Sequence, residues 1–347
     1  MKKILLIGVL AFLLISCKTD NKVEHVERAF YYWKSDDSME DYKTRDNLKS
    51  TAVTKLYIKY FEVDYSETLG NFPYDKTGLG RYSVEYFKDS KIVPTIFIKN
   101  EIFQFNQEKD LDRLADNIVF LVDKYSKEKL DKMSIENEIQ IDCDWTKSTK
   151  EKYFYLLKKI KELSKKEISC TLRLYPYKYP NIMGVPPVDK ATLMCYNLIK
   201  PLTNKDKNSI LDYDELKLYL DQKRSYPIHL DIALPVFYWT HFYHDNQFVG
   251  LTKLSSADLE GFTKPIKPMW YEVTKDTTFG YRDYYRIGDQ FKCEEVSTET
   301  INKAIALIKK NVSLDKNTTI ALFHIDFGTF NKYKNEEISS FYDSFTK

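Results

Sequence analysis

The strongest candidates for chemistry are acidic residues that recur at every second position in one short segment. Polar and apolar residues alternate there: the polar set is Glu138, Gln140, Asp142 and Asp144, and the apolar set is Ile139, Ile141, Cys143 and Trp145. Successive side chains of a β-strand point to opposite faces, so a strand over Glu138 to Trp145 has one acidic and one apolar face. The apolar face must meet a hydrophobic layer. The acidic face then points into the protein, where ionised carboxylates are costly unless they are paired, hydrated or functional.

Two carboxylates on one strand face can take different roles. We expect the inner one, Asp142, to stay ionised and the outer one, Asp144, to become a proton donor in a desolvated cleft. Paired carboxylates with such separated roles suit the cleavage of a glycosidic bond. The competing interpretation is structural: Arg173 and Lys59 neutralise the acids in a buried network. We favour the structural role for Asp231, which lies deep in its own strand.

The same alternation places further polar residues on the inner side. The inward sets are Thr171, Arg173 and Tyr175 in one strand, His229 and Asp231 in another, and His324 and Asp326 in the last. We expect Arg173, Tyr175 and Asp326 to bind substrate beside the acidic pair.

Eight β-rich apolar segments carry these residues. They are Ala29 to Trp33, Lys55 to Val63, Ile92 to Ile98, Glu138 to Trp145, Ile168 to Leu174, Thr192 to Asn197, Pro227 to Val236 and Thr319 to Phe327. Helix candidates lie between or after them at Leu111 to Tyr125, Lys150 to Leu163, Ile210 to Leu220, Thr298 to Asn311 and Asn335 to Thr346. This alternation predicts an α/β protein, a (β/α)8 barrel of the TIM type, and barrel enzymes place their chemistry at the C-terminal ends of the strands. The alternative is an open doubly wound sheet, but no Gly-rich phosphate loop follows any of the segments.

One connection is too long to be simple. Residues 240–297 follow the seventh predicted strand, and His244, Asp245 and Asn246 lie between Phe-rich flanks. We expect a hairpin within a structured insertion between strand 7 and helix 7. The predicted barrel domain spans 29–347.

The N-terminus has the pattern of a secretory signal. Two lysines precede an apolar run from Ile4 to Ile15, and Ser16 and Cys17 follow. Twelve apolar residues are too few for a stable bilayer-spanning helix. The stretch Leu14 to Cys17 resembles the bacterial lipoprotein signal, which implies a signal peptide over 1–16, a lipidated Cys17 with a tether over 17–28, and anchoring in the bacterial cell envelope. The alternative is an ordinary signal peptide or anchor with an incidental cysteine.

Composition narrows the function classes. The chain of 347 residues carries 53 basic and 51 acidic side chains, so its formal charge of +2 argues against a dedicated nucleic-acid binder. The remaining cysteines lack disulfide or zinc spacing, and Cys143, Cys170 and Cys195 fall within strands, where we expect buried free thiols. His241 and His244 lack a third placed ligand, so we expect an exposed hairpin tip there and predict no metal and no cofactor.

Aromatic residues are abundant, with 27 Tyr, 21 Phe and 4 Trp. We expect Trp145 to pack against helices. For Trp33 and Trp239 a sugar-stacking platform at the cleft competes with ordinary core packing.

Two strand motifs resemble those of the chitinase-like family-eighteen glycoside hydrolases. Their signature Asp-x-x-Asp-x-Asp-x-Glu aligns with Asn137, Gln140, Asp142 and Asp144, and the last position here keeps a carboxyl that is one methylene shorter. Met194 to Asn197 resembles the family's Met-x-Tyr-Asp/Asn element. The resemblance implies that Asp144 is the general acid, Asp142 its electrostatic partner, and Tyr196 with Asn197 a clamp for an acetamido group.

The chain resembles even more a group of uncharacterised bacterial barrel lipoproteins. The short sequence motifs that this chain shares with the group lie at Gln140 to Thr146, Pro186 to Asp189, Leu193 to Asn197 and Asp231 to Pro235. The sequence therefore predicts an envelope lipoprotein that binds a polysaccharide or glycoconjugate and hydrolyses it by carboxylate acid catalysis. The alternatives are a non-catalytic glycan-binding barrel and a structural or assembly lipoprotein whose insertion contacts a protein partner.

Overall fold

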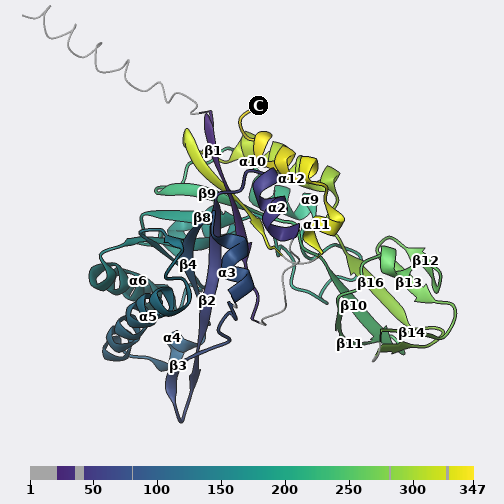
Figure 1. The fold of residues 1–347 in the computed structure, drawn as a ribbon, viewed down its shortest axis with the longest axis horizontal. Helices are drawn as coiled ribbons and strands as arrows, with labels where there is room; N and C mark the ends of the chain where they lie inside the picture. The colour runs from purple at the N-terminus through teal and green to yellow at the C-terminus, as the bar shows by residue number, and fades with distance from the viewer. Residues whose placement is uncertain (1–21, 36–42, 80, 281–282, 326–327) are drawn as a thin grey trace, which may run out of the picture.

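A computed structural model describes residues 22–35, 43–79, 81–280, 283–325 and 328–347. Within these ranges eight parallel strands close into a barrel that helices surround, which confirms the predicted (β/α)8 fold (Figure 1). Two predicted functional residues, Cys17 and Asp326, lie outside the described residues.

The barrel strands follow the chain in order. They are β1 (His25–Tyr32), β2 (Lys55–Ser66), β4 (Lys91–Ile98), β6 (Glu138–Asp142), β7 (Glu167–Arg173), β8 (Lys190–Met194), β9 (His229–Pro235) and β17 (Asn317–Phe323). Each pairs in parallel with its neighbours, and β1 closes the ring by pairing with both β2 and β17. The C-terminal ends of all eight strands therefore open at one end of the barrel.

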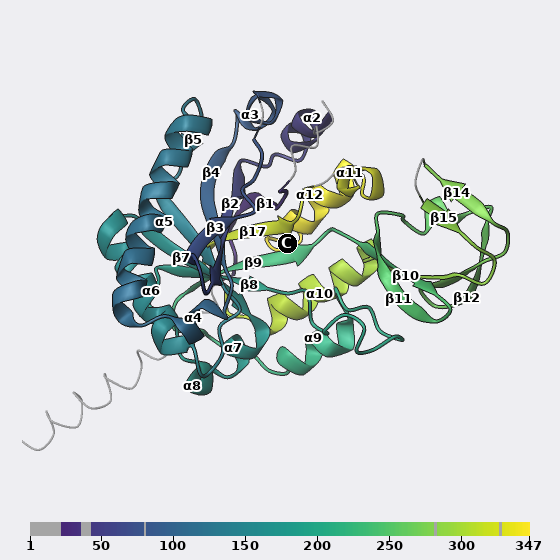
Figure 2. The same ribbon diagram turned by 90° about the horizontal axis from the view of Figure 1, so that it is seen from below.

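Helices connect successive strands and cover the barrel (Figure 2). They are α2 (Lys43–Ser50), α3 (Arg81–Phe87), α4 (Ile102–Phe105), α5 (Glu108–Lys129), α6 (Lys150–Ser164), α7 (Leu174–Lys178), α8 (Pro180–Met183), α9 (Tyr213–Tyr219), α10 (Thr298–Asn311), α11 (Thr329–Lys332) and α12 (Asn335–Asp343). In α6 the buried residues Tyr153, Leu156, Leu157 and Ile160 recur at helical spacing and form one apolar face. The helix ends where Lys165 takes a left-handed conformation with φ of 57°.

The barrel interior is unusually polar, as the alternation in β6 predicts. The Tyr31 hydroxyl donates across the barrel to Gln140 Oε1 over 2.8 Å, and Gln140 Nε2 donates to Thr192 Oγ1 over 3.2 Å. Nearer the N-terminal ends of the strands, Lys190 Nζ lies 2.8 Å from Glu138 Oε2 and 3.8 Å from Asp231 Oδ2. Every one of these side chains is buried or nearly so, hence the interior is held by a hydrogen-bonded network rather than by aliphatic packing alone.

The segment after β9 forms its own antiparallel sheet, which projects to one side of the barrel in Figures 1 and 2. Its strands are β10 (Trp239–His244), β11 (Gln247–Thr252), β12 (Thr263–Lys267), β13 (Trp270–Val273) and β16 (Gln290–Glu294), in the order β11-β10-β16-β13-β12, with a separate pair β14 (Thr277–Phe279) and β15 (Asp283–Tyr285). The turn of the predicted hairpin is at Asp245 and Asn246, both with positive φ, as a type I′ turn requires. A separate apolar cluster around Phe291, Leu259 and Phe262 gives this insertion a core of its own.

Several elements were not predicted from the sequence. The first strand begins at His25 rather than Ala29, and β2 runs on to Ser66 before β3 (Gly70–Tyr74) folds back on it. The short helices α2 and α3 and the two-residue strand β5 (Ser134–Ile135) were also missed. They lack the length or periodicity on which sequence prediction depends.

Candidate functional site

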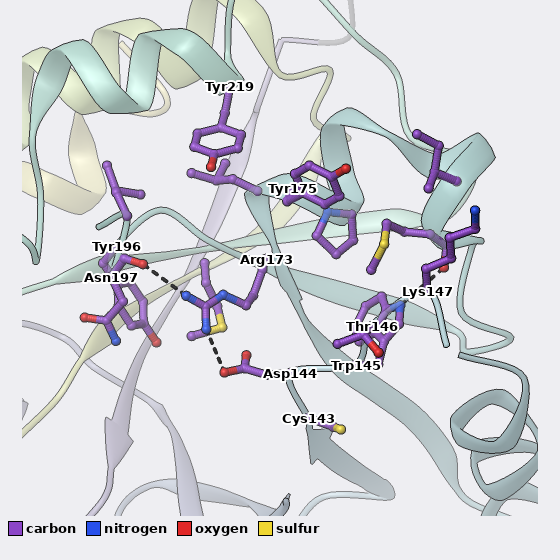
Figure 3. Close-up of a pocket in the computed structure, with 16 residues that line it drawn as sticks. Cys143, Asp144, Trp145, Thr146, Lys147, Arg173, Tyr175, Tyr196, Asn197 and Tyr219 are labelled. Carbon is purple, nitrogen blue, oxygen red and sulfur yellow. Dashed lines mark hydrogen bonds and ion pairs between the residues drawn. The ribbon is translucent and has the colours of Figure 1, made fainter. Parts of the chain in front are cut away.

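A pocket opens at the C-terminal ends of β6, β7 and β8 (Figure 3). Its volume is about 380 Å³, within the range of small-molecule sites. Its lining residues are Cys143, Asp144, Trp145, Thr146, Lys147, Arg173, Leu174, Tyr175, Pro176, Ile182, Met183, Met194, Tyr196, Asn197, Leu198 and Tyr219. Five of the predicted site residues are thus brought together: Asp144, Arg173, Tyr175, Tyr196 and Asn197.

An ion pair forms the polar part of the pocket. Arg173 Nη1 lies 2.6 Å from Asp144 Oδ2, and Arg173 Nη2 donates to the Asn197 backbone carbonyl over 3.1 Å (Figure 3). Asp144 lies two residues beyond the end of β6, and its side chain is 49% exposed. The predicted desolvated environment of Asp144 is therefore wrong: the carboxylate of this outer acid is open to solvent and paired with a cation.

Asp142 is the more perturbed acid. It ends β6, and Thr171 Oγ1 on β7 donates to its Oδ1 over 2.5 Å. Burial and the nearby negative charge of Asp144 raise the pKa of Asp142 to about 7, although Thr171 and Arg173 act in the opposite direction. This is the reverse of the expectation that the inner acid stays ionised, because the sequence does not show which acid the barrel wall desolvates.

The raised pKa of Asp142 makes stability depend on pH. Between the unfolded value near 3.8 and the folded value of about 7, the native state keeps a proton that the unfolded state releases. Stability therefore falls as pH rises from about 4 to about 7, and we expect Asp142→Asn to be more stable than wild type at pH 8, by on the order of 2 kcal/mol. Urea unfolding at pH 5 and pH 8 measures this.

A second variant checks the direction of this pH effect on stability. Thr171→Val removes the hydroxyl that lowers the pKa of Asp142, so its stability should fall more steeply between these two pH values. Equal pH dependence in wild type and Asp142→Asn would contradict the assignment.

Asn197 lines the pocket and carries a side-chain acceptor without a partner in the part of the chain that the structure describes. Its backbone is left-handed, with φ of 53°, a conformation in which Asn is several-fold enriched. Its buried side-chain Oδ1 has no hydrogen-bond partner among the described residues. A buried acceptor without a donor is costly, so a ligand N–H or O–H that reached this atom would be favoured.

Aromatic and apolar side chains form the rest of the lining. Tyr175 in α7 is 46% exposed and packs against Tyr179 with ring centroids 4.8 Å apart. Tyr196 is buried and stacks on Phe323 at 5.1 Å. Trp145 stacks on Tyr153 of α6, as predicted, while its edge still reaches the pocket. Ile182, Met183 and Tyr219 were not predicted as pocket residues. They belong to α8 and α9, in the connections after β7 and β8, and the sequence does not show how these connections fold over the pocket.

The two predicted stacking platforms do not line this pocket. Trp33 lies 5.7 Å from Phe323 between ring centroids, and Trp239 lies 5.4 Å from Phe237. Phe323 and Phe237 each contact Tyr196, so each tryptophan is linked to this pocket residue through one intervening ring. Trp239 also donates from Nε1 to Glu294 Oε2 over 2.8 Å.

The predicted charge partners were partly wrong. Lys59 pairs with Glu62 and Asp75, at 2.6 and 2.7 Å, rather than with Asp142 or Asp231. The structural role favoured for Asp231 is confirmed: it is 1% exposed, contacts His229, and accepts from the Thr319 amide over 2.7 Å.

Other residues were also placed by the structure. His324 is partly buried and its Nδ1 lies 3.2 Å from the Ile325 carbonyl oxygen. His241 is buried and stacks on Trp239 instead of lying at the hairpin tip, where His244 does lie. Cys143, Cys170 and Cys195 are buried free thiols, as predicted.

In residues 22–347, apart from the undescribed gaps, no helix combines the length and apolar character needed to cross a bilayer.

Comparisons with solved structures define the fold class. No protein-family model and no curated protein sequence matches the chain. Among solved structures, the spore cortex-lytic enzyme SleL of Bacillus cereus superposes with a TM-score of 0.53 at 13% identity, over 94% of this chain and 75% of that one. A chitinase from Bacteroides thetaiotaomicron gives 0.51 at 12% identity, over 93% and 97%.

A third structure is a catalytic domain of a chitinase from Ostrinia furnacalis in complex with a chito-oligosaccharide. It gives a TM-score of 0.51 at 11% identity, over 92% of this chain and 95% of that one. At such low identity the similarity establishes the fold alone. The chain is thus a (β/α)8 barrel, and its structural neighbours include chitinase-like barrels.

Proposed function

We propose that the protein binds a glycan in the pocket at the C-terminal ends of β6, β7 and β8. The observation that carries this proposal is the composition of the pocket: a self-neutralising Asp144–Arg173 pair and the unpartnered acceptor of Asn197 lie among aromatic and apolar side chains, of which Tyr175 and Ile182 are exposed. Sugars present both apolar ring faces and hydroxyl groups, and such a lining matches both.

The charge balance of the pocket favours an uncharged ligand. Arg173 and Asp144 cancel each other, and Lys147 is the one further charged side chain among the described residues that line the pocket. A polyanion would find little net attraction there. The comparisons support a neutral, N-acetylated glycan, since structural neighbours include chitinases and one of them holds a chito-oligosaccharide.

Calorimetric titration of the full-length chain in detergent tests the proposal. We expect a panel of N-acetylated chito-oligosaccharides and neutral gluco-oligosaccharides to include a ligand that binds with a measurable Kd. Competition between N-acetylated and unmodified sugars of equal length then shows whether an acetamido group is recognised. Absence of binding to every member of the panel would contradict the proposal.

Hydrolysis is the second candidate function. The observation that favours it is the pKa of Asp142, about 7, next to a second carboxylate at the pocket, which provides an exchangeable proton near neutral pH. In this account the proton held on Asp142 passes to Asp144, which delivers it to the glycosidic oxygen, and Asp142 is left as the carboxylate that acts as electrostatic partner. The pairing of Asp144 with Arg173 favours binding over cleavage, since the acid is already engaged.

Asp144→Asn separates the two candidates. The variant keeps the size and a hydrogen-bond acceptor of Asp144 but removes its proton chemistry. If the protein hydrolyses its ligand, release of reducing ends should fall at least about a hundredfold, as expected when general acid catalysis is lost. Equal cleavage by Asp144→Asn and wild type would exclude Asp144 as the acid, and no cleavage by wild type would leave glycan binding as the function.

We further propose that Cys17 is lipidated and anchors the barrel in the bacterial envelope. Support comes from the apolar run and the Leu14 to Cys17 motif. Metabolic labelling with an alkyne fatty acid should mark the wild-type chain but not Cys17→Ser. Equal labelling of the two chains, or no labelling of wild type, would contradict lipidation.

A further inference from the structure

A buried ion pair lies where the insertion meets the barrel. Lys292 Nζ and Glu294 Oε1 are 2.5 Å apart, and their side chains are 1% and 0% exposed. Both residues belong to β16, and their spacing of two places them on the same face of that strand. Burying two charges is costly unless their remaining donors and acceptors are also satisfied.

The connection between β8 and α9 satisfies them. Glu294 Oε2 accepts from the Ser209 backbone amide over 3.0 Å and also from the Ser209 hydroxyl. Lys292 Nζ donates to the carbonyls of Asn204 and Lys207 over 3.1 and 2.7 Å. The pair on the insertion therefore holds a segment of the barrel's own connection.

Neighbouring bonds reinforce the same attachment. Trp270 Nε1 donates to the Lys205 carbonyl over 2.9 Å, and Asn208 Nδ2 donates to the Glu295 carbonyl over 2.8 Å. The attachment thus extends along 204–209, with the Lys292–Glu294 pair as its buried centre.

The same connection carries part of the pocket. The Leu198 amide donates to the Ser209 carbonyl over 3.1 Å, and the Asn197 amide donates to the Ile210 carbonyl over 2.7 Å. Asn197 in turn accepts from Arg173, which pairs with Asp144. Glu294 is therefore connected to the ion pair in the pocket by hydrogen bonds through Ser209 and by the peptide unit between Asn197 and Leu198.

We infer that Lys292 and Glu294 are positioning residues for the pocket: they fix the β8–α9 connection so that Asn197 and Arg173 keep their places. This inference rests on the proposed function of the pocket, and it gives the insertion a role within the barrel's own site. Displacements of about 1 Å in a binding constellation are enough to weaken it strongly. Asn197 is sensitive to such a change, because bonds of its backbone to Ile210 and Arg173 hold its left-handed conformation.

Hydrogen exchange of the full-length chain in detergent, without ligand, tests the positioning step. In Glu294→Gln, we expect the amides of Asn197, Leu198 and Ser209 to exchange at least about tenfold faster than in wild type, with β7 unchanged. Glu272→Gln is the matched control, since Glu272 pairs with Lys264 on the exposed side of the same insertion, 2.8 Å apart. Its exchange pattern at these three amides should equal that of wild type.

A double variant guards against global unfolding. Lys292→Met with Glu294→Gln leaves no unpaired buried charge, so the fold should be retained, while the donors to Asn204 and Lys207 are lost. Unchanged exchange at Asn197 and Leu198 in both the single and double variants would overturn the inference, whether or not a glycan binds.

Ligand affinity provides the functional readout. For tri-N-acetylchitotriose, we expect the Kd of the double variant to rise about 3- to 30-fold, the usual range for residues that act through a contact network. Faster exchange with an unchanged Kd would also overturn the positioning role. Failure of the wild-type chain to bind any glycan would instead count against the proposed function.

Discussion

Lys190→Met is expected to lower the free energy of unfolding by about 3–5 kcal/mol, as happens when one partner of a buried ion pair is removed. Lys190 is the cation between Glu138 and Asp231, whose side chains are 6% and 1% exposed. Burial already raises the pKa of Glu138, and Lys190 is the main influence that opposes this rise. Without Lys190, these two buried carboxylates near the N-terminal ends of the strands lose their shared cation. His229 and the more distant Lys55 are then left to offset their negative charge. Urea unfolding at pH 8 measures the loss.

The loss should shrink at lower pH. In the variant, the pKa of Glu138 lies further above its unfolded value, so the native state takes up a proton as pH falls and its penalty is relieved. We therefore expect a smaller difference from wild type at pH 5 than at pH 8. Lys303→Met is the matched control, because Lys303 pairs with Glu299 on an exposed helix face, and it should leave the free energy of unfolding nearly unchanged. Equal effects of the two substitutions would contradict the buried-network account.

Tyr175→Ala is expected to weaken glycan binding by about 10- to 100-fold, in line with the truncation of an aromatic residue at a binding hot spot. Tyr175 lines the pocket and is 46% exposed, so a sugar ring can cover it while its removal leaves the barrel core intact. Calorimetry with the tightest ligand of the panel measures the change in Kd.

Tyr284→Ala is the control for Tyr175→Ala. Tyr284 is 52% exposed on β15 of the insertion and does not line the pocket. Its truncation should leave the Kd unchanged. If both variants bind as tightly as wild type, stacking on Tyr175 is not part of recognition.

The fold could be predicted because strand alternation and helix periodicity are local signals. All eight barrel strands were predicted to within a few residues of their observed bounds. The predicted bounds of α10 match the observed ones. The β6 pattern also predicted the correct inner face, where Glu138 accepts from Ser169 on β7 and Gln140 donates to Thr192 on β8. These properties follow from the periodicity of each segment, so they do not depend on which distant residues pack against it.

The chemistry of the site depended on distant neighbours and was harder to predict. Alternation brought Asp142 and Asp144 to one face, but the degree of burial of each acid is set by where β6 ends and by Thr171 and Arg173 on β7. The expectation that Asp142 stays ionised was therefore wrong. The role of Glu294 was likewise hidden, because its partner Ser209 is 85 residues away in the chain.

The most direct test of the account is a crystal structure of the full-length chain with the tightest oligosaccharide of the panel. We predict that a sugar ring packs on Tyr175, and that one of its polar groups donates to Asn197 Oδ1 beside the Asp144–Arg173 pair. A sugar bound at another place, such as the insertion alone, with this pocket empty, would contradict the central claim.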